Sequence, residues 1–462
     1  MRMAFGLMRF AAALAWALVC AWQPAPTLAN RPQPDEQRSV AVAGPTPRPD
    51  IAKQLAEAEL AYEMGHDALA AKREQLAMQL FSLACEQGDP RSCHNVGVLA
   101  EEEMRAANDP SRPRATTISA IVSAYSDACE LGFQRACAML VPYLRSAEYG
   151  MQDTGKAIAM ARTACEAGEN FACAELAEMY YRGEGMAPDL SAAARLFRSL
   201  CEAQWQADHC FNYGLMLEQG HAKDSQGDLP IRYYRLGCRR GSDAACINLA
   251  INYATNALPE NLEIAAGLFE QACDHGARVA CTNLAALTYD HRLVPDFETQ
   301  AAILYRSACQ AGDGKACRGL GNLALGGVRE AGPHGDAIAL FVKGCELGSG
   351  ISCYNAGLMY FIGHHVRSDL KLSERWFAKG CALESASACA GAALVTYSPD
   401  GATPVSGTGM SRRWLELARS FDPADPLVVS IDEWLNMGAP ADQRPLPPLS
   451  PPFLSGHPKE DR

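Results

Sequence analysis

The sequence predicts an all-α protein in which αα-hairpins repeat end to end as a right-handed solenoid. Eighteen of the 19 cysteines form nine pairs, with a separation of 8 residues in eight pairs and 9 in one. Successive first cysteines lie 35 to 37 residues apart after a first interval of 44. Such a period is typical of a supersecondary unit copied along the chain. The pairs are Cys85 and Cys93, Cys129 and Cys137, Cys165 and Cys173, Cys201 and Cys210, Cys238 and Cys246, Cys273 and Cys281, Cys309 and Cys317, Cys345 and Cys353, and Cys381 and Cys389.

Turn residues separate two helical stretches in each unit. In the unit that begins at Cys165, Gly168 suits the left-handed position just after a helix end. Gly183, Gly185 and Pro188 interrupt the next helix, and Asp189 is placed to cap the one after it. A helix, a turn and a second helix are therefore expected in each unit.

The cysteine spacing predicts a chain reversal between the two members of each pair. Residues i and i+8 of one straight helix are about 12 Å apart, whereas a disulfide requires Cα atoms within about 7 Å. Zinc sites favour Cys-x(2–4)-Cys, and this spacing does not occur in the sequence. An even number of cysteines in an exported chain favours disulfides. We therefore expect nine bridges between helix ends.

The first 29 residues predict export. Arg2 and Arg9 precede an apolar run over 10–22, and small residues near Ala29 suit a cleavage site. The run is shorter than the ~20 residues of a membrane-spanning helix, and no later segment is apolar over that length. Residues 1–29 are interpreted as a signal peptide, which would remove Cys20. We expect a periplasmic or secreted protein without a transmembrane segment.

The stretch CEAGENFACAELAEMYYRGEGMAPDLSAAARLF, with CEQGDPRSCHNVGVLAEE and CELGSGISCYNAGLMYFIG, resembles the cysteine-rich branch of the Sel-one-like repeats, relatives of tetratricopeptide repeats. The resemblance covers about residues 65 to 397. Local departures are an eight-residue insertion near 104–117, Gln204 and Trp205 where other units have Gly, and Glu384 at the same place in the ninth unit. Proteins that resemble this branch often carry a beta-lactamase label.

Segments without cysteine flank the repeats. We expect a Pro-rich leader over 30–49, N-terminal capping helices over 50–84, nine cysteine-paired repeats over 85–397 and a degenerate capping repeat over 398–438. Residues 439–462 contain seven Pro. This tail is interpreted either as a polyproline ligand for another domain or as a disordered tail, and its composition favours the latter.

Catalytic motifs are almost absent from the sequence. Of the serine beta-lactamase elements, only Ser-x-x-Lys occurs, at Ser368 to Lys371, and Asp369 within it matches the helix-starting Asp of other units. The adjacent pair His364 and His365 is interpreted as a solvated loop beside Arg367 rather than a metal site. We expect no cofactor, no metal and no catalytic residue.

A polar position recurs two residues after the second cysteine, and five of nine units have Asn there. In the related tetratricopeptide repeats, the position that this resembles lies on the inner helix face, where an Asn amide can bind an extended peptide backbone. The alternative is an Asn that bonds locally to backbone near a helix start. The candidate binding residues are His94, Asn95, Asn212, Asn248, Asn283, Arg318, Tyr354 and Asn355.

These observations favour an exported scaffold that binds a peptide or an envelope protein on its concave face. The formal net charge of -12 and the lack of a basic stripe disfavour nucleic acid as the main partner. One alternative, suggested by the family labels, is a protein that binds or hydrolyses beta-lactams or cell-wall fragments. Another is an assembly factor for redox or metal enzymes. The partner and the oligomeric state are not specified by the sequence.

Overall fold

The computed structural model describes residues 49–106, 114–147, 150, 152–222, 229–255, 258–396 and 408–436. The predicted signal peptide, residues 30–48 of the leader and the tail over 439–462 lie outside these ranges. The described residues form 21 α-helices, with two short 3-10 helices, η2 (Arg329–Ala331) and η3 (His334–Asp336), between α16 and α17. Consecutive helices pack as antiparallel hairpins, so the predicted all-α repeat solenoid is confirmed.

The helices alternate between two layers. The even-numbered ones are α2 (Pro49–Ala70), α4 (Pro90–Ala106), α6 (Gln134–Arg145), α8 (Asn170–Arg182), α10 (Ala207–Glu218), α12 (Asp243–Thr255), α14 (Arg278–His291), α16 (Gly314–Leu325), α18 (Gly350–Ile362), α20 (Ala386–Thr396) and α22 (Pro426–Asn436). The odd-numbered ones are α3 (Glu74–Glu86), α5 (Arg114–Glu130), α7 (Thr154–Glu166), α9 (Leu190–Glu202), α11 (Pro230–Arg239), α13 (Pro259–Asp274), α15 (Phe297–Gln310), α17 (Ala337–Glu346), α19 (Leu370–Ala382) and α21 (Thr408–Phe421).

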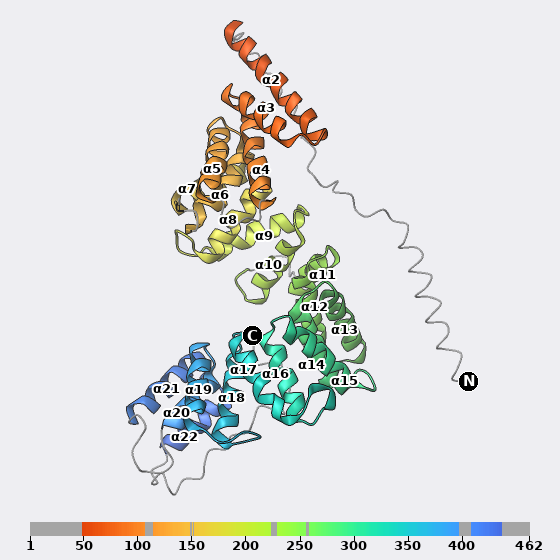
Figure 1. Cartoon of the computed structure of the whole chain (residues 1–462), viewed down its shortest axis with the longest axis vertical. Helices are drawn as coiled ribbons and strands as arrows, with labels where there is room; N and C mark the ends of the chain where they lie inside the picture. The colour runs from red at the N-terminus through yellow and green to blue at the C-terminus, as the bar shows by residue number, and fades with distance from the viewer. Residues whose placement is uncertain are drawn as a thin grey trace, which may run out of the picture.

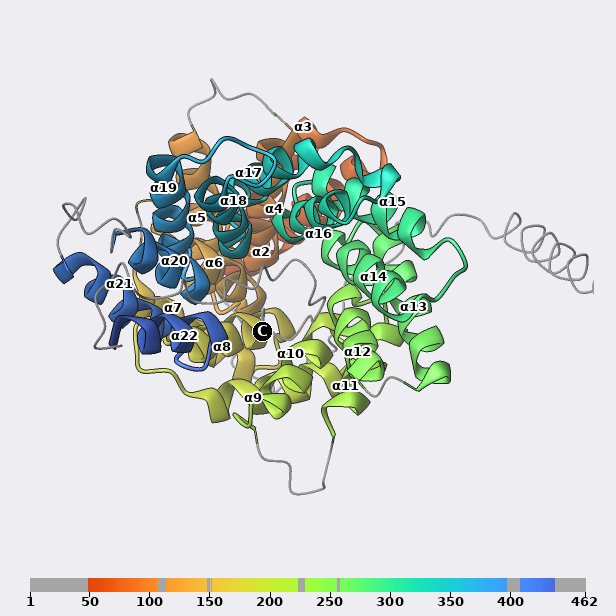
Figure 2. The ribbon, with the colours of Figure 1, turned by 90° about the horizontal axis from the view of Figure 1, so that it is seen from below.

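The even-numbered helices form the inner layer of a curved superhelix. Even-numbered neighbours such as α6 and α8, α10 and α12, or α16 and α18 pack on each other, whereas no two odd-numbered helices of the described chain pack closely. A layer whose members approach more closely lies on the inside of the curve. Figure 2 shows this arrangement, with α10, α12, α14 and α16 nearer to the middle of the ring than α9, α11, α13 and α15. Figure 1 shows the two halves of the chain displaced along the long axis.

All nine predicted disulfides are present, and each joins the end of an odd-numbered helix to the start of the next even-numbered helix. Their Cα atoms are 4.5 to 4.8 Å apart. The chain therefore reverses between the two cysteines, as their spacing requires.

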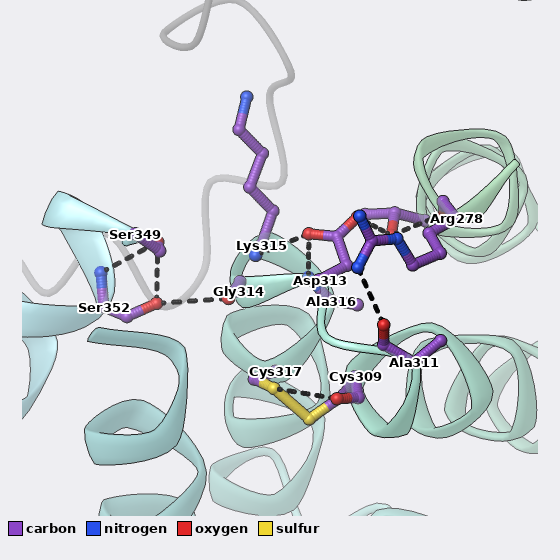
Figure 3. Close-up of a disulfide and its surroundings, with 11 residues drawn as sticks. Arg278, Cys309, Ala311, Asp313, Gly314, Lys315, Ala316, Cys317, Ser349 and Ser352 are labelled. Atoms are coloured by element: carbon purple, nitrogen blue, oxygen red, sulfur yellow. Dashed lines mark hydrogen bonds between the residues drawn. A yellow bond between two sulfur atoms is a disulfide. The ribbon is translucent and has the colours of Figure 1, made fainter. Parts of the chain in front are cut away.

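The turn inside each bridge depends on one left-handed residue and often on a capping side chain. Between Cys309 and Cys317, Gly312 has φ +95°, and the Asp313 carboxylate accepts hydrogen bonds from the amides of Lys315 and Ala316 at 2.8 and 3.3 Å (Figure 3). These bonds satisfy amides that the first turn of α16 leaves without an intrahelical partner. The predicted roles of Gly168 and Asp189 are confirmed, with φ +95° at Gly168 and a 2.8 Å bond from the Ala192 amide to Asp189.

An aromatic ring packed on a small residue fills the core of most hairpins. The ring stands four residues before the first cysteine and is buried in Phe81, Tyr125, Phe197, Tyr234, Phe269, Phe341 and Phe377. Four residues after the second cysteine, Gly97, Gly214, Gly321 and Gly357 leave room for the facing ring. A Cβ atom added at Gly357 would lie 2.6 Å from the Phe377 ring. The Phe377 ring therefore leaves no room for a Cβ atom at Gly357.

We predict opposite effects of the same substitution at two helical glycines. Gly357→Ala forces Phe377 out of its packing position and should destabilise the protein by about 1 to 3 kcal/mol. Gly267 lies on the exposed side of α13 with no atom within 4 Å of an added Cβ, so Gly267→Ala should stabilise by about 0.5 to 1 kcal/mol. Urea unfolding of oxidised protein measures both. Equal effects would contradict the packing argument.

Candidate binding surface

The recurring Asn position lies on the inner helices. Asn95, Asn212, Asn248 and Asn283 stand on α4, α10, α12 and α14, and each is half-buried. The Asn95 amide nitrogen lies 3.4 Å from Nε2 of His66 on α2, the preceding inner helix. The position therefore faces the junction between neighbouring inner helices.

The amides at this position differ in whether they are already hydrogen bonded. Asn248 is hydrogen bonded to the Tyr234 hydroxyl of α11, which also donates to Glu218 at 2.7 Å. Asn212 and Asn283 make no hydrogen bond with other described residues. The partners of Asn95 and Asn248 are thus side chains of other helices, not the local backbone considered from the sequence. Asn212 and Asn283 keep free donors and acceptors.

Other predicted binding residues differ in their accessibility. Arg318 is half-buried on α16, where its positive charge acts on the nearby Tyr305 hydroxyl. Tyr354 and Asn355 are each 1% exposed, and the Tyr354 ring packs 5.6 Å from that of Phe377. Tyr354 and Asn355 therefore do not belong to the candidate surface, because a partner could not contact them without opening the core.

His94 packs into the hairpin core. Its ring lies 5.6 Å from Tyr125 and 5.2 Å from Phe133, and its Nδ1 atom has no hydrogen-bond partner among the described residues. Burial, with a smaller contribution from the positive charge of Arg135, lowers the pKa of His94 to about 4. His94 is therefore neutral at pH 7 and contributes packing rather than charge.

A charged cavity on the inner layer was not predicted from the sequence. Arg145 at the end of α6 is paired with Glu175 of α8 and with Glu184 in the loop that follows α8, at 2.7 Å to the latter. These side chains line a cavity of about 630 Å³ with Gln152 and Thr154. Glu175 stands two residues after Cys173, at the recurring polar position, so the repeat alignment could have placed it there.

The Ser-x-x-Lys match is explained by helix capping. The Asp369 carboxylate accepts from the amides of Lys371 and Leu372 at 3.0 Å each, which makes it the N-cap of α19. The Ser368 hydroxyl donates to the Phe361 carbonyl at 3.2 Å. The hydroxyl and the Lys371 side chain are both exposed to solvent. This arrangement repeats the Asp189 cap of α9 and gives no observation in favour of a catalytic serine.

Three histidines from two loops meet at one edge of the solenoid. His364 and His365 contact each other with ring centroids 4.1 Å apart, and His334 stacks on His365 at 5.2 Å. The participation of His334 was not predicted, because it lies 30 residues earlier in the chain. All three are exposed, and the described residues contain no group of three His, Cys, Asp or Glu side chains placed to hold a metal ion. Nor does the described part contain a helix long and apolar enough to cross a bilayer.

The hairpins, their curvature and their stapled turns define an αα-repeat solenoid with an inner surface. The Sel1 repeat model matches residues 54–89, 143–169, 170–204, 243–276, 279–313 and 350–385. The chain is a Sel1 repeat protein. Cys173 and Cys201 lie in the matched segment 170–204, whereas their partners Cys165 and Cys210 lie outside it. Two bridges, Cys165–Cys173 and Cys273–Cys281, have their cysteines in two consecutive matched segments.

A solved structure of low sequence identity shares the fold. A protective antigen of uropathogenic Escherichia coli strains with an SLR fold is 19% identical, with a TM-score of 0.51 over 84% of this chain and 89% of that one. A Sel1 repeat protein from Oxalobacter formigenes is 20% identical, with a TM-score of 0.41 over 78% and 90%. No curated protein matches the chain. The likeness to the protective antigen supports the architecture and says nothing of a partner.

We predict that His94 makes the protein sensitive to acid. The unfolded chain takes up a proton near pH 6.5, whereas folded His94 does so only near pH 4. The contribution of neutral, folded His94 to the free energy of unfolding is therefore fully present above pH 6.5. It is lost as the pH falls from about 6.5 to about 4. His94→Phe should reduce the loss of unfolding free energy between pH 7.5 and pH 5 by about 2 kcal/mol. Urea titrations at both pH values measure this loss.

The matched control is His221→Phe, because His221 is exposed in the loop that follows α10. The control should leave the difference in stability between the two pH values unchanged. If His94→Phe also leaves it unchanged, the assignment of acid sensitivity to His94 is wrong.

Proposed function

We propose that this protein is an exported scaffold that binds an extended peptide segment of a partner protein along its inner layer. The observation that carries this proposal is the row of Asn212, Asn248 and Asn283 on three successive inner helices. A side-chain amide offers both a donor and an acceptor, which is the pattern that an extended peptide backbone requires. Two of the three amides are free of bonds to other described residues.

An apolar row accompanies the amides. Leu215, Ile251 and Ala286 stand three residues after the three Asn residues, one helical turn further along the same side of each helix. All three are half-buried. A bound peptide could therefore place backbone groups on the amides and apolar side chains on the neighbouring row. This combination favours an extended segment with spaced aliphatic residues.

The cysteine chemistry supports export to the periplasm or beyond. Nine disulfides would not persist in a reducing cytosol, whereas an oxidising compartment maintains them. The basic and apolar pattern of residues 1–29 agrees with this destination.

A displayed library of random linear peptides tests the proposal with a defined probe. Peptides selected on the immobilised oxidised protein should bind with a preference for spaced aliphatic residues. The triple change Asn212→Ala, Asn248→Ala and Asn283→Ala should weaken a selected peptide at least about tenfold, which is about 1.4 kcal/mol of binding free energy. Isothermal titration calorimetry measures the affinity.

The outer layer provides the matched control. Glu270→Ala and Gln271→Ala change exposed side chains of α13, on the far side of the hairpin from the amides, and should leave the affinity unchanged. Selected peptides whose affinity does not depend on the three Asn residues, or depends equally on α13, would overturn the proposed surface.

A further inference from the structure

The bridge between Cys201 and Cys210, which joins α9 to α10, differs from the other eight. Its cysteines are nine residues apart rather than eight. The left-handed position of its turn is occupied by Gln204 at φ +59°, whereas Gly168 has this role in the preceding bridge. A residue with a Cβ atom is strained in this conformation by about 1 kcal/mol or more. The α9–α10 turn is therefore held in a conformation that its own sequence disfavours.

Arg240 contacts this disulfide. Its Nη1 atom donates to the Cys201 carbonyl at 2.6 Å and to the Cys210 sulfur at 3.5 Å. The Arg240 guanidinium therefore contacts both cysteines of this bridge. A neighbouring guanidinium stabilises a thiolate relative to a thiol, so it also makes the sulfur a better leaving group when the bridge is attacked.

His209, the residue before Cys210, weakens the same turn. It is 7% exposed, and neither ring nitrogen has a hydrogen-bond partner among the described residues. Its ring stacks on Phe197 of α9 with centroids 5.9 Å apart. Buried polar groups without partners cost free energy that is recovered when the turn opens to water. Segments of low local stability are those that open without global unfolding.

We propose that Cys201–Cys210 is a redox-sensitive joint, opened by a dithiol reductant before the other eight bridges and with the rest of the solenoid still folded. Both cysteines are buried, so the reductant reaches them when the strained α9–α10 turn opens. Three independent features favour that opening or the reduction that follows it: Gln204, His209 and Arg240.

The reaction balances as a two-electron exchange. One thiolate of the dithiol attacks the Cys201 sulfur, the bond between the two protein sulfurs breaks, and its electron pair leaves with the Cys210 sulfur as a thiolate beside Arg240. The second thiol of the reductant then attacks the mixed disulfide as its thiolate and releases the Cys201 thiolate. The protein bridge is reduced and the dithiol is oxidised to its own disulfide.

Opening this joint would alter the inner surface at a defined place. The cavity beside Arg145 belongs to α6 and α8 on one side of the joint, and the amide row belongs to α10, α12 and α14 on the other. The joint lies in the middle of the superhelix (Figure 1). After reduction, the bridge would no longer fix the angle between these two parts. The other eight bridges would still hold the hairpins within each part.

The order of bridge opening tests the proposal. The full oxidised chain is equilibrated in dithiothreitol buffers of increasing ratio of reduced to oxidised reagent, then alkylated and digested, and each bridge is quantified by mass spectrometry. Cys201–Cys210 should open at the lowest ratio, about three- to tenfold below the next bridge. Circular dichroism at that ratio should still show the helical content of the oxidised protein.

Three variants test how much the Arg240 guanidinium contributes to the reduction of this bridge. Arg240→Gln should raise the ratio needed to open this bridge about threefold or more, and Arg240→Lys should restore part of the effect because it keeps the charge. Arg278→Gln is the matched control. Arg278 donates to the Ala311 carbonyl in the Cys309–Cys317 turn at 2.8 Å, and its side chain points away from the two sulfurs of that bridge (Figure 3). It should leave the ratio for Cys201–Cys210 unchanged.

Two other bridges provide internal comparisons in the unmodified chain. Both cysteines of Cys165–Cys173 are half-exposed, so this bridge would open first if access alone set the order. The Cys381–Cys389 turn has Glu384 at φ +61°, so it would open together with Cys201–Cys210 if backbone strain alone set the order. Either result overturns the proposal, as does simultaneous opening of all nine. This comparison tests the proposed order of bridge opening even if a variant does not fold.

Discussion

The reversal of the chain within each disulfide-bonded turn is the constraint on which the rest of this structure depends. A bridge fixes the end of an outer helix to the start of the next inner helix, with Cα atoms 4.5 to 4.8 Å apart. Each closes a loop of nine or ten residues, for which chain entropy predicts about 2 to 3 kcal/mol. Because every bridge joins an outer helix to the next inner helix, the bridges fix the register of the stack.

Polar contacts extend this constraint from one turn to the next. Ser242 donates to Asp208 at 2.5 Å, Thr282 to Asp313 at 2.7 Å, and Ser387 to Asp425 at 2.5 Å. Each bond links residues 31 to 38 apart, which is about one repeat. These bonds thus link neighbouring repeats at three separate places along the solenoid. Close packing of the inner helices against each other then produces the concave surface.

The joint at Cys201–Cys210 interrupts this regularity where the proposed binding row begins. The row of amides starts on α10, immediately after the bridge. A scaffold of stapled repeats changes shape little, since packed hairpins move as units. A turn with a strained Gln204 and a buried His209 without partners is a place where such a scaffold can bend. This turn is also where the sequence departs from the other units, with Gln204 and Trp205 in place of Gly.

The sequence by itself determined the repeat, its helices and all nine disulfides, because cysteine spacing and turn residues such as Gly312 and Asp313 act over a few residues. It also indicated that Ser368 to Lys371 reflects a helix cap, for the same local reason. Only the tertiary structure decided which side chains are accessible. Asn212 and Asn355 occupy the same position in their units, yet Asn355 is 1% exposed and Asn212 half-buried, because packing between neighbouring helices differs along the superhelix. Contacts between residues 30 or more apart, such as Arg145 with Glu175, or Arg240 with Cys210, likewise arise only when successive repeats stack.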